Sequence, residues 1–313
     1  MPILAIAHEI KKLDHSVEII YVGEKGTKFP ALLDDNTDID QIYRVYAGKF
    51  RRFYGESFSS HLLDWSTNLK NIRDICYVIF GIFESILLLR KLKPNIILIN
   101  GYVGLPIGLS ARILQTPFIT QDSNAMGNLT NKIVGRWAKT NAVAFDAEYY
   151  NYHHKDRIKK VGIPLDSNYK LVSQLDVVEF RRELKIPEKS RVLLLIGGSL
   201  GAQAINKAFS SIFNKLIDNF PDIYIIHQVG RGKLGVYDGI RIPSNMKVLE
   251  FIAEAYKYSG AADVVIARAG ATTLAELAVQ GKAAIIIPNP KLTAGHQLKN
   301  ANQILKNGAG IVI

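Results

Sequence analysis

The chain has 313 residues, of which 48% are hydrophobic and 21% charged, a composition typical of a globular protein with a substantial core. Its one cysteine, Cys76, excludes an intramolecular disulfide, and we expect that side chain to be buried. The formal charge of +11 permits nucleic acid, an anionic membrane or a phosphorylated substrate as a partner. At about 100–200 residues per domain, the length predicts two domains.

The first half of the chain predicts alternating helices and strands. A helix is expected from Pro2, because proline suits a first helical position and an apolar stripe follows it. The longest apolar stretch, residues 77–90, is interrupted by Glu84 and is shorter than the roughly 20 residues that span a bilayer. A long helix is expected to end at Pro94, and a shorter one to cover 129–139. Strands are predicted at 16–23, 95–102, 116–120 and 141–146.

The second half repeats this alternation after a linker predicted near residues 162–175. Near-continuous apolar strands that alternate with helices are typical of parallel sheets covered on both faces. The sequence therefore predicts an α/β protein with two doubly wound domains. Strands are predicted at 191–198, 222–230, 246–252, 262–270, 282–290 and 307–313.

A glycine-rich loop follows the first strand of the second half. Gly197, Gly198 and Gly201 surround Ser199, between an apolar strand and a helix. Glycines allow close approach of a ligand, and the N–H groups at a helix start favour phosphate. The spacing is not G-x-G-x-x-G, and no P-loop lysine follows. A phosphate site and a tight turn that needs glycine are both consistent with the pattern.

An arginine follows the strand predicted at 262–270, directly before another helix. Thr273 and Glu276 match the S/T-x-x-E capping box, which would explain both residues. It does not explain Arg268, because a cation near a helix N-terminus is unfavourable for the helix dipole. An anionic ligand between the two would compensate.

A third loop lies between Pro288 and the helix that begins near His296 and Gln297. Polar residues are common at the start of a helix, which is an alternative explanation for these two residues. All three loops follow strands of the second half, and in open parallel sheets this edge holds the ligand. Their convergence indicates a binding site there.

The first half carries weaker signals. Glycines from Gly101 to Gly108 surround one strand-to-helix turn, and Asp122 to Asn124 follow another strand; turns and caps explain both equally well. No metal-binding histidine spacing and no nucleophile elbow is present. The basic runs 49–56 and 90–93 are either solvated faces or, with their aromatic neighbours, contacts for an anionic membrane.

These motifs together resemble the MurG family, which transfers N-acetylglucosamine (GlcNAc) from UDP-GlcNAc to lipid I, the undecaprenyl-pyrophosphoryl-MurNAc-pentapeptide, to make lipid II. The resemblance covers nearly the whole chain and is strongest in "IGGSLGAQAIN", "ARAGATTLAELAVQGKAAIIIP", "GHQLKNA", "NGYVGLP" and "SNAMGNLTNK". It implies a GT-B fold, with two Rossmann-like domains facing a cleft. Residues 1–164 would form the acceptor and membrane-associated domain, and residues 165–313 the donor domain.

The resemblance also implies the site residues. It implies no cofactor and no metal. Its partners are UDP-GlcNAc, lipid I and the anionic inner face of the cytoplasmic membrane, where the protein would be peripheral; no nucleic acid is expected. The acceptor side would include Gly101, Tyr102 and Gly104. The donor site would comprise Ser199 at the diphosphate, the Ile252 backbone at uracil, Arg268, Gly270 and Thr273 at the nucleotide and phosphates, Glu276 at the ribose, and His296, Gln297 and Asn124 at the sugar.

The chain departs from the family pattern at three places. The family begins with a strand and a GGTGGHxxP loop, of which only Pro2 is matched, so we expect the glycine loop and its histidine, a candidate general base, to be missing. The C-terminal helices are expected to be missing too, and Asp166 occupies an arginine position. The catalytic residue is therefore unassigned. The working hypothesis is retained donor binding with impaired catalysis. The alternatives are a related GT-B enzyme with another lipid acceptor and a noncatalytic UDP-sugar-binding protein of envelope assembly.

Overall fold

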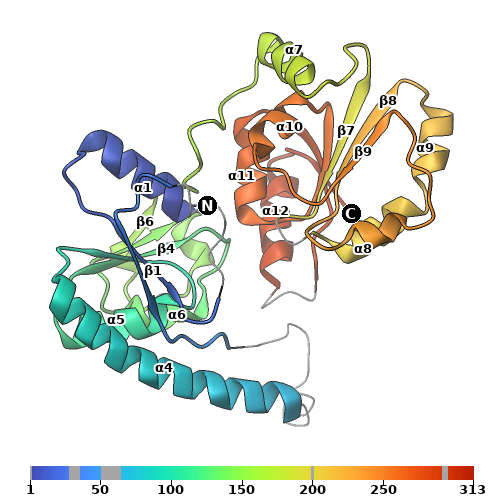
Figure 1. The fold of residues 1–313 in the computed structure, drawn as a ribbon. Coiled ribbons are helices and arrows are strands. Elements are labelled where there is room, and N and C mark those ends of the chain that lie inside the picture. The colour runs from blue at the N-terminus through green and yellow to red at the C-terminus, as the bar shows by residue number, and fades with distance from the viewer. Residues whose placement is uncertain (1, 28–35, 51–64, 199–200, 291–294) are drawn as a thin grey trace. The chain divides into compact units, whose positions relative to one another are not determined.

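The computed structural model describes residues 2–27, 36–50, 65–198, 201–290 and 295–313. The chain forms two compact units (Figure 1). The first contains Met1–Asp166 together with Gly295 and His296, and the second contains Ser167–Pro290 and Gln297–Ile313. The sequence predicts the division at residues 164 and 165, two residues earlier.

The strands of the first unit form two parallel sheets. The first pairs β1 (Ile20–Glu24) with β2 (Gln41–Val45). The second contains β3 (Ile97–Ile99), β4 (Phe118–Asp122), β5 (Thr140–Val143) and β6 (Ile158–Lys160), hydrogen-bonded in chain order. Strands β2 and β6 are absent from the prediction, because both are short, polar and largely exposed, so neither carries an apolar run.

Helices cover these sheets. The core between them includes Val78, Leu105 and Phe118. Helix α6 is shorter than the predicted 129–139, because Gly135 ends it and the chain then enters β5. The helices are α1 (Pro2–Leu13), α4 (Trp65–Leu92), α5 (Gly104–Ile113) and α6 (Leu129–Val134), with 3-10 turns η1 (Ala147–Tyr149) and η2 (Lys155–Arg157).

The second unit is built on one parallel sheet of six strands, in the order β12-β11-β10-β7-β8-β9. The chain starts this sheet at β7, adds strands on one side, and then returns to add strands beside β7 on the other side. The strand order therefore reverses between β7 and β10. The strands are β7 (Arg191–Ile196), β8 (Ile223–Gln228), β9 (Met246–Leu249), β10 (Val264–Ala267), β11 (Ala283–Ile286) and β12 (Ile311–Val312).

Helices pack on both faces of this sheet, which confirms a doubly wound arrangement. Figure 1 shows α10, α11 and α12 on one side and α8 and α9 on the other. One buried cluster, around Val265 and Leu274, fills the first side, and another, around Phe209 and Ile225, fills the second. The helices are α7 (Gln174–Glu183), α8 (Gln203–Ser210), α9 (Phe213–Asn219), η3 (Leu234–Tyr237), α10 (Ala255–Ala261), α11 (Ala271–Val279) and α12 (His296–Lys306).

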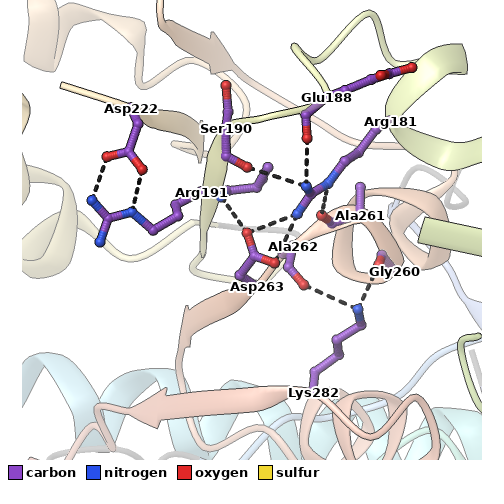
Figure 2. Close-up of polar contacts among 11 residues, drawn as sticks. Arg181, Glu188, Ser190, Arg191, Asp222, Gly260, Ala261, Ala262, Asp263 and Lys282 are labelled. Carbon is purple, nitrogen blue, oxygen red and sulfur yellow. Dashed lines mark hydrogen bonds and ion pairs between the residues drawn. The ribbon is translucent and has the colours of Figure 1, made fainter. Parts of the chain in front are cut away.

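A network of ion pairs and hydrogen bonds lies where the strands of this sheet begin (Figure 2). Arg181, from α7, donates two hydrogen bonds of 2.8 Å to the carboxylate of Asp263. Its other N–H groups donate to the backbone carbonyls of Glu188, Ser190 and Ala261. Asp263 also accepts a hydrogen bond from the backbone of β7. The network fixes α7 to the sheet and leaves the guanidinium of Arg181 fully used.

Candidate functional site

The strand order places a candidate site at the opposite edge of the same sheet. In doubly wound sheets, ligands bind outside the carboxyl ends of the strands, at the point where the strand order reverses. That point lies between β7 and β10. The loops that follow these two strands are the glycine-rich loop and the segment that begins with Arg268.

The glycines of the first loop have two different explanations. A Cβ on Gly197 would lie 2.3 Å from the backbone nitrogen of Ala202, and one on Gly201 would lie 1.9 Å from the carbonyl oxygen of Val229. Close backbone packing therefore requires glycine at both positions. Gly198 has a φ of +78° but no atom within 4 Å of a Cβ, so its conformation, not its packing, requires glycine. Ser199, the expected diphosphate contact, lies outside the described residues.

Arg268 carries a charge without a carboxylate partner among the residues that the structure describes. Its Nη1 atom donates to the backbone carbonyls of Ile287, at 3.0 Å, and Pro288, at 3.3 Å. The side chain is half-buried, and that burial lowers the pKa of the guanidinium. Two carbonyls hold the group in place without neutralising it, so an anion at this edge would be stabilised.

The capping-box interpretation of Thr273 and Glu276 is wrong. Helix α11 begins at Ala271, and Gly270 is its N-cap residue, with a φ of −69° and no side-chain cap hydrogen bond. Thr273 is therefore the third residue of the helix and Glu276 lies in its middle. Glycine is an acceptable N-cap, and here it starts the helix three residues before the threonine could.

Gly270 is not required by its conformation. Its φ is one that any residue adopts, and the nearest atom to a Cβ placed on it would be the Thr273 hydroxyl oxygen, at 3.6 Å. Glycine at this position therefore leaves the start of α11 open on the side of its N–H groups. Arg268, Gly270, Thr273 and Glu276 are all half-buried, so each is partly accessible from this edge.

The loop that follows β9 carries Ile252, whose side chain is only 9% exposed and packs into the apolar cluster beneath the sheet. The backbone of Ile252, and not its side chain, is what this loop can offer to a ligand. That arrangement agrees with the expectation that Ile252 contacts uracil through its main chain, which stays a prediction.

At the start of α12, one predicted sugar contact has a structural function. Gln297 is 8% exposed, and its Oε1 atom accepts a 2.8 Å hydrogen bond from the backbone N–H of Asn289. His296, beside it, is half-buried. Asn300, which lies in the GHQLKNA motif but has no predicted role, is fully buried and donates a 3.1 Å hydrogen bond to the carbonyl of Ala269. Asn300 thus positions the loop between Arg268 and α11.

In the first unit, the expected acceptor-side glycines have local explanations. Gly101 has a φ of +75°, and a Cβ on Gly104 would lie 2.3 Å from the Ile99 side chain. Tyr102 donates a 2.6 Å hydrogen bond to Glu24, and burial, with that carboxylate, raises the pKa of the Tyr102 hydroxyl. Their contact with an acceptor stays a prediction.

The polar segment after β4 is also tied into the fold. The carbonyl of Asn124 accepts a 2.8 Å hydrogen bond from the Tyr150 hydroxyl. Asp122 is 2% exposed, accepts hydrogen bonds from Tyr152 and Asn128, and has its pKa raised by burial. This segment is a rigid support at the carboxyl end of β4, with the Asn124 side chain half-buried at its surface.

The structure thus brings most of the predicted donor residues to one edge of the second sheet. Arg268, Gly270, Thr273 and Glu276 follow β10, Ile252 follows β9, and Gln297 follows β11. His296 is grouped with the first unit. Asn124 and the acceptor-side residues belong to the first unit. No cluster of three or more histidine, cysteine, aspartate or glutamate residues able to hold a metal is found in the described part of the chain.

Two family models match the chain. The glycosyltransferase family 28 N-terminal domain matches residues 1–143, and the glycosyltransferase family 28 C-terminal domain matches residues 192–313.

Curated relatives match over the full length. The chain is 30% identical to the UDP-N-acetylglucosamine–N-acetylmuramyl-(pentapeptide) pyrophosphoryl-undecaprenol N-acetylglucosamine transferase of Acetivibrio thermocellus, over 100% of this chain and 80% of that protein. It is also 30% identical to the transferase of the same name from Listeria welshimeri, over 100% of this chain and 82% of that protein.

Solved structures agree with these relatives. The crystal structure of Acinetobacter baumannii MurG matches with a TM-score of 0.66 and 25% identity, over 100% of this chain and 81% of that one. A calicheamicin glycosyltransferase matches with a TM-score of 0.63 at 12% identity, over 100% of this chain and 81% of that one, which shows a shared fold alone.

Proposed function

The chain belongs to the MurG family, and on that premise we propose how its described residues bind the substrates of that family. The fold is GT-B, with two Rossmann-like α/β units. The reaction is the transfer of GlcNAc from UDP-GlcNAc to lipid I, which gives lipid II for peptidoglycan synthesis.

The donor nucleotide is proposed to bind at the carboxyl edge of the second sheet. The observation that carries this proposal is Arg268, a half-buried guanidinium without a carboxylate partner in the described part of the chain, at the point where the strand order reverses. It lies in sequence directly before the open N-terminus of α11. Arg268 and the N–H groups of α11 together would favour a diphosphate.

The other residues of this edge are assigned to the rest of UDP-GlcNAc. The backbone of Ile252 would contact uracil, and Glu276, which does not cap α11, would accept hydrogen bonds from the ribose hydroxyls. His296 would contact the sugar. The side-chain oxygen of Gln297 already accepts a hydrogen bond from Asn289, so Gln297 would hold that loop in position beside the sugar. Only its amide N–H groups would remain to donate to a sugar hydroxyl.

Charge stabilisation is the part of the reaction that the described residues of the donor edge can supply. A hydroxyl of the acceptor attacks C1 of the sugar with inversion and gives up its proton to a base that is not assigned among the described residues. The bond from C1 to the phosphate oxygen breaks, so negative charge grows on the departing UDP. Donors already in place at that oxygen lower the barrier, because they need no rearrangement during the reaction. Arg268, held by two backbone carbonyls, is such a donor.

Transfer to lipid I tests the function directly. The purified chain, a short-chain lipid I and labelled UDP-GlcNAc should give a lipid II analogue, whereas a panel of other polyprenyl and natural-product acceptors should not. A full rate of transfer to lipid I would overturn the hypothesis of impaired catalysis. Preferred transfer to another acceptor would contradict the assignment of lipid I. Tight binding of UDP-GlcNAc by calorimetry without transfer to any acceptor would favour a noncatalytic UDP-sugar-binding protein.

The membrane surface is a second proposed partner, and it rests on helix α4. One face of α4 packs on the first unit through Val78, Gly81 and Leu89. The opposite face is apolar too, and Cys76 on it is exposed, which corrects the expectation that this side chain is buried. Its large side chains are Trp65, Leu69, Ile72, Phe80, Phe83 and Leu87, which are 58–75% exposed.

This exposed apolar face suits a membrane surface. The exposed apolar side chains from Trp65 to Leu87 extend along about 33 Å of α4, and an apolar stripe of that length is unusual on a soluble surface. Arg90 and Lys91 lie on the same helix and favour anionic headgroups, whereas Arg73 is already ion-paired with Asp74. No helix in the described ranges is long and apolar enough to cross a bilayer. We therefore propose that α4 lies on the inner face of the cytoplasmic membrane, where a lipid-linked acceptor is presented.

Flotation with vesicles tests this proposal. The double variant Phe80→Ser and Phe83→Ser should stay unbound to vesicles that contain anionic lipid, whereas the wild-type chain should float with them. The matched control is Leu171→Ser with Leu175→Ser, because these side chains are 74% and 82% exposed but lie outside α4. Equal loss of flotation in both double variants would refute the role of α4.

A further inference from the structure

The strand between the two nucleotide-binding loops ends in a buried amide. Strand β8 lies between β7 and β9, so the loops that follow β7 and β9 flank its carboxyl end. Gln228, the last residue of β8, is only 5% exposed. Its Nε2 atom donates to the carbonyl of Gly198, at 3.2 Å, and to the carbonyl of Glu250, at 3.3 Å. A side-chain amide has two N–H donors, so it can serve both carbonyls at once.

The two bonds join loops with different tasks in the proposed donor site. Gly198 belongs to the glycine-rich loop, on the diphosphate side, and Glu250 precedes Ile252, on the uracil side. Gly198 has no side chain, and a Cβ there would contact nothing within 4 Å, so backbone bonds are its main restraint. The carboxylate of Glu250 in turn accepts a 2.7 Å hydrogen bond from the backbone of Gly232.

The neighbouring residues of β8 are held from the other side. Asn206, on α8, donates a 2.8 Å hydrogen bond to the carbonyl of Val229, and its Oδ1 atom accepts a 3.1 Å hydrogen bond from Nε2 of the His227 ring. His227 also bonds to the hydroxyl of Tyr237, at 2.7 Å. Because the residues on both sides of Gln228 are fixed, its side chain can act as a rigid spacer.

We propose that Gln228 is a positioning residue that holds the phosphate-side and uracil-side loops at the separation of a uridine diphosphate before the donor binds. This inference rests on the proposed donor site. A ligand that spans both loops then binds without the entropy cost of ordering them. Preorganisation of the two loops therefore strengthens binding. Gln228 itself touches the loops and not the chemistry, so its loss raises KM for UDP-GlcNAc and leaves kcat largely unchanged.

The informative probes are UDP, which spans both loops, and uridine, which occupies the uracil side alone. In Gln228→Met, two hydrogen bonds disappear while the side-chain length is kept, so we expect UDP affinity to fall by about 10-fold or more. Uridine, measured by competition, should keep its affinity. Gln228→His keeps a single ring N–H donor and should lie between the wild type and Gln228→Met.

The matched control is Gln280, a second buried glutamine of the same unit. It is 2% exposed, donates to the carbonyl of Tyr256 at 2.8 Å and accepts from Ser259 at 2.6 Å, and it follows the C-terminal end of α11. Gln280→Met removes two hydrogen bonds as well, and should lower thermal stability without changing UDP affinity.

Three results would overturn the inference. These are unchanged UDP affinity in Gln228→Met, an equal loss for UDP and uridine, and an equal loss of UDP affinity in Gln280→Met. If both Gln228 variants fail to fold, Gln228 is a core residue and the proposal is equally rejected. Absence of UDP binding by the wild-type chain is a different outcome, because it removes the donor site itself.

Discussion

Two arginines lie at opposite edges of the second sheet and have opposite surroundings. Arg181, at the edge where the strands begin, donates to a carboxylate and three backbone carbonyls (Figure 2). Arg268, at the edge where the strands end, donates to two carbonyls and has no ion pair with any described residue. The Arg181 side chain is 11% exposed and Arg268 is half-buried, so both are at least partly shielded from solvent, but only the first charge is neutralised within the protein.

The difference separates support from binding. A shielded charge with a complete set of partners stabilises the fold and has no unused N–H donor to offer a ligand. A shielded charge that is held by carbonyls alone is costly to the fold, and such a cost is typical of functional sites. The two arginines therefore agree with the proposal that the amino edge supports the fold and the carboxyl edge binds the donor. Substitutions at each edge should separate the two roles.

The largest expected effect comes from removing the unpaired charge. Arg268→Met should lower kcat/KM for UDP-GlcNAc by about 100–1000-fold, because a preorganised donor to the departing diphosphate is lost. Thermal unfolding should change little. Arg268→Lys, which keeps the charge but not the two-pronged geometry, should recover part of the rate. A stable Arg268→Met variant with wild-type kcat/KM would refute the assigned role.

The paired arginine should give the reverse result. In Arg181→Met, Asp263 loses its partner and three carbonyls lose their donor, so we expect the free energy of unfolding to fall by about 2 kcal/mol, less than for a fully buried pair because Asp263 is half-exposed. Chemical denaturation measures this change. The folded fraction should keep its kcat/KM, and a large loss of activity per folded molecule would contradict the contrast between the two edges.

Acid should weaken the support beneath the carboxyl edge. Burial lowers the pKa of His227 to about 4, from about 6.5 in an unfolded chain. The neutral imidazole therefore contributes stability that is complete above about pH 6.5 and is lost as the pH falls toward 4; at pH 5 the loss is about 2 kcal/mol.

Denaturation at pH 7.5 and pH 5 should show this loss in the wild-type chain. In His227→Gln, the part of the pH dependence that comes from His227 should be absent. Exposed histidines contribute equally to both proteins, so they cancel in the comparison. An identical pH dependence in the variant would show that His227 does not titrate in this way.

The smallest effects concern the helix caps. Thr273→Ala should change the free energy of unfolding by less than about 0.5 kcal/mol, because Gly270 and not Thr273 begins α11. The matched control is Ser173→Ala in α7, where Ser173 and Asp176 do form a capping box, and there we expect a loss of about 1 kcal/mol. Equal losses in the two variants would restore the capping interpretation.

The fold of the second unit could be predicted from the sequence because its strands are buried on both faces and therefore read as continuous apolar runs. Strands β2 and β6 could not, since short polar strands at a sheet edge carry no such signal. The exposure of Cys76 was also unpredictable. Both faces of α4 are apolar, and only packing decides which of them is covered.

The candidate site divides in the same way. Arg268 could be found because a charged residue at the end of an apolar strand is a local anomaly. The capping-box prediction for Thr273 and Glu276 was wrong because the S/T-x-x-E spacing does not fix the residue at which the helix begins. The first residue of α11 depends on how the chain leaves β10. Gln228 gave no signal, and Asn300, although it lies in the GHQLKNA motif, gave no sign of its structural role. Their partners lie about 20–30 residues away in the sequence, and only the folded chain brings them together.

Hydrogen–deuterium exchange with and without UDP-GlcNAc tests the central claim, that the carboxyl edge of the second sheet holds the donor. The account predicts that the ligand slows exchange of the backbone amides in 250–254 and 268–274, while exchange in 188–191 and 260–263 at the opposite edge is unchanged. Protection confined to the amino edge, or no protection of either edge at saturating UDP-GlcNAc, would contradict it.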